Sequence, residues 1–143
     1  MMTKIKELFH KYREIIIYLL VGGLTTVIAW GCMFFVNIVI FGNPLHPSKM
    51  QNLVLSVVNW TAGVIAAYPM NRKWVFESKS ADIFGECMKF VAGRIVTLVL
   101  EIVFRQILGA VGVDVFITTL ICAILVIIGN YIFSKLFVFR KKE

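Results

Sequence analysis

One stretch of this sequence, from Ile15 to Phe41, contains no charged residue and is long enough to cross a membrane. A helix needs about 20 apolar residues to span a hydrocarbon core about 30 Å thick. Three further apolar stretches follow, so the sequence predicts an all-α membrane protein with spans at residues 15–41, 53–70, 90–108 and 115–133. Of all residues, 59% are hydrophobic and 16% charged, whereas soluble domains have about 45–50% and about 25%. This composition excludes a soluble domain.

Lysine and arginine gather on one side of the expected spans. The N-terminal segment 1–14, the loop 71–89 and the basic tail 134–143 carry four each, whereas the other two loops carry only Lys49. Cytoplasmic loops are enriched in these residues, so we expect both termini and the middle loop to be cytoplasmic. The net charge of +7 then fits an anionic membrane surface rather than nucleic acid.

Segment 1–14 is an expected interfacial helix. Ile5, Leu8, Phe9 and Tyr12 recur at helical spacing among basic residues, which is typical of a helix lying in the membrane interface.

Catalytic patterns are missing from the sequence. The three cysteines are widely spaced, the two histidines are isolated, and no nucleophile–base pair is seen. The sequence therefore predicts a protein that is not an enzyme and needs no metal or cofactor.

The ends of the second and fourth expected spans repeat one pattern. Residues 68–76 and 131–139 lie 63 positions apart, and both fit Tyr-x-x-(Asn/Ser)-(Arg/Lys)-x-(Trp/Phe)-Val-Phe. The starts of the first and third spans, residues 18–22 and 90–94, are looser relatives. We therefore predict one domain made of two tandem two-helix repeats with the same topology. Parallel repeats recur in transporters, often with the substrate site between the halves.

The repeated ending places a cation at the same point of each repeat. Arg72, followed by Lys73, matches Lys135. Positive-inside charge and an aromatic belt explain either copy alone. The recurrence favours a paired cationic site for a lipid phosphate, at which Arg72 and Lys135 converge about a pseudo-two-fold axis. The aromatic residues that follow the cations are expected anchors at headgroup depth: Trp74, Phe76, Phe137 and Phe139.

The third expected span carries charges on one stripe. Arg94, Glu101 and Arg105 fall within about 40° of one another on a helix, with Thr97 nearby. An intramembrane charge costs about 2.5–3.5 kcal/mol on insertion scales, so these side chains should face a polar interior. Glu101 and Arg105 are spaced to pair. A structural ion pair that only orients the bundle explains the same stripe.

Amide side chains complete the predicted polar cavity. Asn59 lies on a face of small residues in the second span, where helix packing is an equally good explanation. The predicted cavity comprises Asn59, Asn71, Thr97, Glu101, Arg105 and Asn130.

Four of these features, in order, resemble the GtrA family. They are Leu-Val-Gly-Gly-Leu at residues 20–24, Asn-Arg-x-Trp-Val-Phe at 71–76, Arg94 early in the third span, and Asn-Tyr-x-x-x-Lys-x-Phe-Val-Phe at 130–139. The resemblance covers about residues 15–140. It implies a small bacterial four-span protein that helps to move a polyprenyl-phosphate-linked sugar across the cytoplasmic membrane. The sugar would then glycosylate a surface polymer such as O-antigen or teichoic acid.

The leading hypothesis is therefore a flippase, or an essential flippase component, in which Arg94 meets the lipid phosphate and Glu101 accepts sugar hydroxyls. One alternative is a non-transporting anchor or scaffold for a glycosyltransferase, which would not need Glu101. Another is a small multidrug-type exporter, but the carboxylate that such proteins carry in the first span is missing here. Four short helices enclose little volume, so we expect a homo-oligomer or a complex with a membrane glycosyltransferase.

Overall fold

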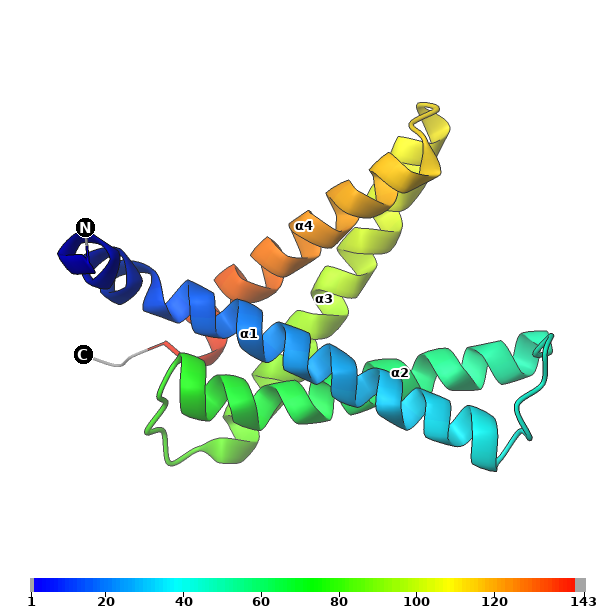
Figure 1. Ribbon diagram of the computed structural model, residues 1–143, viewed down its shortest axis with the longest axis horizontal. Coiled ribbons are helices and arrows are strands. Elements are labelled where there is room, and N and C mark those ends of the chain that lie inside the picture. Colours follow the sequence, from blue (N-terminus) through cyan, green and yellow to red (C-terminus); the bar gives the residue numbers. More distant parts are fainter. Residues whose placement is uncertain (1, 141–143) are drawn as a thin grey trace. The chain divides into compact units, whose positions relative to one another are not determined.

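The computed structural model describes residues 2–140, and side chains from residue 9 onward. Within these residues the fold is all-helical and has no strand, which confirms the predicted class. The expected interfacial segment 1–14 continues into the first span as one helix, and the side chains of Ile5 and Leu8 lie outside the described residues. The elements in order are α1 (Met2–Val39), α2 (Lys49–Met70), the π-helix η1 (Asn71–Val75), α3 (Ile83–Ala110), α4 (Val115–Phe133) and the π-helix η2 (Ser134–Val138) (Figure 1).

Three helical stretches are long and apolar enough to cross a membrane, which indicates a multi-pass membrane protein. They are Phe9–Val39, Lys49–Val75 and Val115–Val138. The third expected span, residues 90–108, lies in α3, whose 28 residues would extend about 42 Å. Three charged residues, Arg94, Glu101 and Arg105, lie within this stretch, so the third span stays a prediction.

The first compact unit, residues 1–77, is a helical hairpin of α1 and α2 that ends in η1. Its connecting loop contains Pro44 and Pro47, which disfavour a continuous helix, and α2 begins directly after it. The Ser48 hydroxyl accepts from the Gln51 N–H at 3.2 Å, and the Gln51 side chain accepts from the Ser48 N–H at 2.8 Å. This capping box satisfies two unpaired donors. It starts α2 at Lys49, four residues before the expected span 53–70.

The second compact unit, residues 78–143, is a hairpin of α3 and α4 that ends in η2. The Asp82 carboxylate accepts from the Gly85 N–H at 2.8 Å, and Asp114 accepts from the Phe116 N–H at 2.8 Å, so both helices begin at an N-cap. The expected cytoplasmic loop 71–89 is largely helical instead. Only residues 76–82 are irregular, because η1 continues to Val75 and α3 starts at Ile83.

Both hairpins end in a π-helix at positions 63 residues apart. The Phe76 N–H donates to the Asn71 carbonyl at 3.0 Å, and the Phe139 N–H donates to the Ser134 carbonyl at 2.8 Å. Pro69 precedes η1, but Ile132 takes the equivalent place before η2, so proline is not required for the wider turn. Both π-helices carry the shared residue pattern. Single π turns within helices often mark functional positions.

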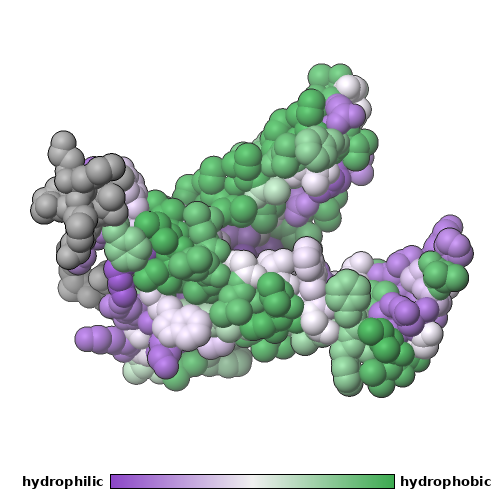
Figure 2. Space-filling model, in the orientation of Figure 1, coloured by the Kyte–Doolittle hydropathy of each residue, from purple (hydrophilic) through white to green (hydrophobic). Residues whose placement is uncertain are grey.

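The buried residues of α1 and α3 follow one register. Tyr18, Val21 and Thr25 are buried in α1, and residues 90, 93 and 97 are buried in α3, 72 positions later. Most other large apolar side chains are exposed, as the hydrophobic surface of the helices in Figure 2 shows. A thin core with an apolar exterior suits helices surrounded by lipid, where burial of apolar surface gives little driving force for packing.

Candidate functional site

In each hairpin, a residue of the first helix contacts a residue that follows the π-helix. In the first unit, Arg13 of α1 pairs with Glu77, which follows η1, at 2.8 Å. In the second unit, Phe90 of α3 packs against Phe139, which follows η2, with ring centroids 6.1 Å apart. Of the cations predicted to meet a lipid phosphate, Arg72 and Lys73 lie in η1, Lys135 lies in η2, and Arg94 lies in α3.

The predicted phosphate-binding cations differ in their surroundings. Arg72 is half-buried and Lys73 is exposed in η1. Lys135 is exposed in η2, where its ammonium donates to the Tyr131 hydroxyl at 3.1 Å and lies 5.4 Å from the centre of that ring. The tyrosine therefore orients Lys135 along the helix. The convergence of Arg72 and Lys135 stays a prediction.

Two of the predicted polar residues have a buried carbonyl oxygen with an open hydrogen-bonding position. Asn71 is 1% exposed. Its amide nitrogen donates to the Ala67 carbonyl at 2.8 Å. The side-chain oxygens of Asn71 and Asn59 have no hydrogen-bond partner among the described residues. Such an oxygen costs about 1–3 kcal/mol when it stays unpaired, so both can accept from a water or a ligand hydroxyl.

Thr97 and Asn130 meet in the core of the second hairpin. The Thr97 hydroxyl donates to the Asn130 side-chain oxygen at 2.7 Å and shares its proton with the Arg94 carbonyl at 3.0 Å. Close helix approach makes this contact possible. A Cβ at Gly93 would overlap the Phe133 ring, so only glycine fits there.

The charged stripe of α3 divides into two parts. Glu101 accepts from Arg105 at 3.0 Å, as the spacing predicted, and Arg105 also reaches the Thr119 hydroxyl of α4 at 3.3 Å. The side chains of Glu101 and Arg105 are 30% and 45% exposed. Nearer the start of α3, the guanidinium of Arg94 lies over the Phe90 ring, 4.9 Å from its centre. The backbone carbonyl of Arg94 accepts from Thr97, one turn further along α3.

The four expected aromatic anchors form two classes. Trp74 and Phe137 are exposed, as an anchor at headgroup depth must be, and their anchoring role stays a prediction. Phe76 and Phe139 are only 7% and 6% exposed. Burial gives these two phenylalanines a packing function at the ends of η1 and η2.

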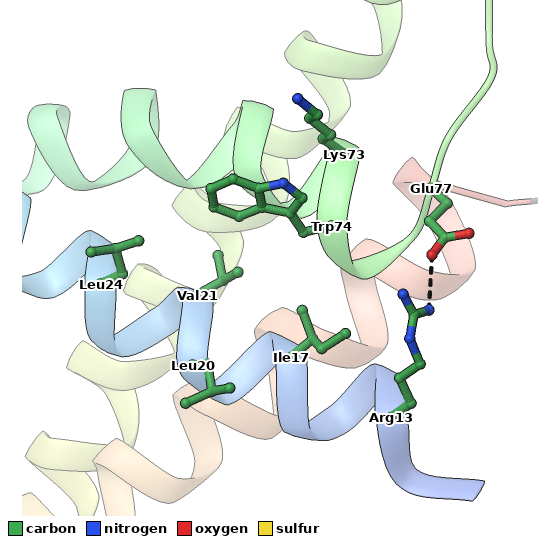
Figure 3. A pocket seen from close by; sticks show the side chains of 8 residues that line it. All are labelled: Arg13, Ile17, Leu20, Val21, Leu24, Lys73, Trp74 and Glu77. Carbon is green, nitrogen blue, oxygen red and sulfur yellow. Dashed lines mark hydrogen bonds and ion pairs between the residues drawn. The ribbon is translucent and has the colours of Figure 1, made fainter. Parts of the chain in front are cut away.

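The first unit contains a cavity of about 410 Å³ between α1 and η1. Figure 3 shows Arg13 extending to Glu77 at its mouth, while Trp74 projects from η1 toward the face of α1 that carries Val21. Lys73 lies on the rim and extends away from Arg13. The complete lining is Arg13, Ile17, Leu20, Val21, Leu24, Lys73, Trp74 and Glu77.

Sequence reasoning missed Arg13, Glu77 and Thr119. Arg13 and Glu77 are 64 residues apart, and the sequence carries no signal for this pairing beyond their opposite charges. Thr119 lies one turn inside α4, and only the register between α3 and α4 places it beside Arg105. Among the residues that the structure describes, no three His, Cys, Asp or Glu side chains gather as a metal site requires.

The sequence profile described as "GtrA/DPMS, transmembrane domain" matches residues 17–139. The chain belongs to this family. It is similar to curated proteins called "Cell wall teichoic acid glycosylation protein GtcA": 29% identical to one from Listeria monocytogenes and 26% to one from Listeria innocua serovar 6a, each covering 99% of this chain and 100% of the relative. It is also 25% identical to the "Uncharacterized membrane protein YwcD" of Bacillus subtilis, over 88% of this chain and 96% of that one. No solved structure matches significantly.

Proposed function

We propose that this GtrA-family protein moves a polyprenyl-phosphate-linked monosaccharide across the cytoplasmic membrane, alone or as the essential part of a flippase. The sugar serves to glycosylate a surface polymer, and the names of the Listeria relatives favour teichoic acid. The family and the apolar helices place the chain in a membrane. A carrier lipid already dissolved in that membrane needs help only for its phosphate and its sugar.

The buried contact between Thr97 and Asn130 is the observation that carries this proposal. It puts a hydroxyl and an amide between α3 and α4, with Arg94 one turn before Thr97. Polar groups in membrane helices are costly and commonly mark a substrate pathway. Sugar hydroxyls both donate and accept hydrogen bonds, so they can exchange with this pair during passage.

The proposal includes four spans, two tandem repeats and cytoplasmic termini. The matched π-helices support the repeats. A second matched detail lies in the first helix of each hairpin. The Thr25 hydroxyl donates to the Gly22 carbonyl at 3.0 Å, and Thr97 donates to the Arg94 carbonyl at the same distance, 72 positions later. Arg94 thus occupies the place of Gly22, which gives the second repeat a cation that the first lacks.

Cells lacking this protein provide the test. If it translocates the loaded lipid, the polyprenyl-phosphate sugar is still made and accumulates, while the surface polymer loses its sugar. If it only anchors a glycosyltransferase, synthesis of the lipid-linked sugar itself falls. Thin-layer quantification of the labelled lipid, together with surface lectin binding, separates the two. Restoration by the intact chain but not by Asn130→Leu, at equal protein level, supports the polar pathway.

A further inference from the structure

The cavity between α1 and η1 has the layout of a site for an amphiphile. Its floor is made by one face of α1, on which residues 17, 20, 21 and 24 follow at helical spacing. These positions form an apolar track of about 10 Å along the helix axis. Trp74 covers the track, and the charged groups stand only at its mouth.

The track points in the direction that a membrane lipid requires. Arg13 comes just before the uncharged stretch that begins at Ile15, so it lies where that stretch leaves the hydrocarbon. The residues of the track lie further inside the same stretch. A molecule with its head at Arg13 therefore extends its chain toward the membrane interior, parallel to the surrounding lipid.

The charged residues of the lining carry a net positive charge, but one of the cations already holds a carboxylate. Arg13 and Lys73 carry two positive charges and Glu77 one negative charge, and Lys73 extends away from the Arg13–Glu77 pair. The side chains of Arg13 and Glu77 are 45% and 56% exposed, and ion pairs this accessible to solvent contribute little. Glu77 also has φ of 48°, a left-handed conformation that is uncommon outside glycine.

We propose that this cavity binds a single-chain lipid phosphate, with Arg13 as the headgroup-binding cation and Glu77 as a placeholder that the phosphate displaces. A phosphate monoester carries more charge and more acceptor oxygens than a carboxylate. Arginine can meet it through two parallel N–H groups. Displacement frees Glu77, the last residue of the first compact unit, from its contact with α1. A cavity of about 410 Å³ is within the range of small-ligand sites and holds the head and the first part of one chain.

The second repeat does not contain this site. Offsets of 72 and 63 residues place Gly85, Leu136 and Arg140 where the first repeat has Arg13, Lys73 and Glu77. Two of these positions are uncharged, and Arg140 has the opposite charge to Glu77. The cavity is therefore a specialisation of the first hairpin, and it is separate from the polar pair in the core of the second.

The test measures binding and not transport, so it can fail while the proposed translocation holds, and the reverse. It uses the full chain in phosphatidylcholine nanodiscs. Two of its three tryptophans are replaced, Trp30→Phe and Trp60→Phe, so that Trp74 alone gives the tryptophan emission. Farnesyl phosphate is titrated and Trp74 emission is recorded. We expect a saturable change with farnesyl phosphate, and none with inorganic phosphate or farnesol at the same concentrations.

Variants then identify the roles of the two charged residues. Glu77→Gln should raise the affinity about three- to tenfold, whereas Arg13→Gln should lower it about tenfold or more. The double variant should match Arg13→Gln, because Glu77 acts only through Arg13. Lys11→Gln, which removes a nearby charge outside the lining, should have little effect. Misfolding cannot raise affinity, so the Glu77→Gln arm is informative by itself.

Several results would overturn the proposal. These are a silent Trp74, a lower affinity in Glu77→Gln, or equal effects of Arg13→Gln and Lys11→Gln. Phosphatidylglycerol that matches farnesyl phosphate would show an ordinary two-chain bilayer lipid as the occupant, against the single-chain assignment.

Discussion

The hydroxyl of Thr97 donates to the side-chain oxygen of Asn130 across 33 residues of sequence, at 2.7 Å. This bond ties α3 to α4 and puts a sugar-like hydroxyl–amide contact in the core of the second hairpin. Thr25 is the counterpart of Thr97 in the first hairpin and donates to the Gly22 carbonyl of its own helix, while the position that matches Asn130 is occupied by Ala67. The two hairpins thus share one pattern of buried positions in their first helices but differ in polarity.

This difference gives a matched pair of variants. Thr97→Val removes the donor to Asn130 at nearly constant volume, and we expect it to lower the free energy of unfolding by about 0.6 to 1.7 kcal/mol, the range of interhelical bonds in membranes. Thr25→Val removes only a bond within α1, so it should change the free energy of unfolding by a few tenths of a kcal/mol. Unfolding in mixed micelles followed by circular dichroism measures both. Equal losses would mean that the Thr97–Asn130 bond contributes nothing.

The close approach at Gly93 predicts a second asymmetry. Gly93→Ala places a methyl group in the Phe133 ring, which is itself stacked on Phe137 at 4.9 Å. The ring cannot move without loss of that contact, so we expect destabilisation of about 1–3 kcal/mol. Gly23→Ala, with nothing within 4 Å of the added methyl group, is the control and should be neutral or better. Thermal unfolding of the two variants makes the comparison, and identical midpoints would disprove the packing argument.

Asn71 should behave as a residue kept for function rather than for stability. Asn71→Leu removes the oxygen that has no partner among the described residues, and the Ala67 carbonyl still receives the Asn71 backbone N–H. Stability should therefore change by less than about 1 kcal/mol or increase. Surface glycosylation should fall at an unchanged protein level. Full glycosylation in this variant would remove Asn71 from the pathway.

The topology can be tested at two loop positions. Leu45→Cys is placed in the loop between α1 and α2, where Leu45 is 95% exposed, and Lys79→Cys in the exposed connection before α3. The three native cysteines are first replaced by serine. An impermeant maleimide applied to intact cells should label position 45 but not position 79. The opposite pattern would invert the proposed orientation.

Hydropathy located the apolar helices along the sequence because span length is a local property, whereas the orientation inferred from charge stays a prediction. The end of α2 at Met70 and both bounds of α4, at 115 and 133, agree with the expected spans. The start of α2 differs from the expected start at residue 53, because the capping box at Ser48 extends the helix over polar residues that do not contribute to an apolar stretch. The helical conformation of residues 71–75 was not predicted, because a π turn has no known sequence signature beyond the repeated ending.

The candidate site could be anticipated only where its contacts are local or repeated. The pair of Glu101 and Arg105 follows from helical spacing, and the resemblance to the GtrA family directed attention to Asn130. The partner of Asn130 could not be inferred, because it depends on the register between two helices. Arg13 and Glu77 were missed for the same reason, since only the closed hairpin brings them together.

Translocation itself is the central claim, and access of the sugar to an impermeant reagent tests it most directly. The protein is reconstituted in liposomes with a radiolabelled short-chain prenyl-phosphate glucose in both leaflets, and periodate is added outside. The account predicts that wild-type vesicles lose nearly all of the intact lipid, whereas protein-free vesicles and Asn130→Leu vesicles keep the inner-leaflet share. An inner-leaflet share that stays equally protected in wild-type and protein-free vesicles would contradict translocation by this protein alone. The same result after addition of the glycosyltransferase partner would contradict the account as a whole.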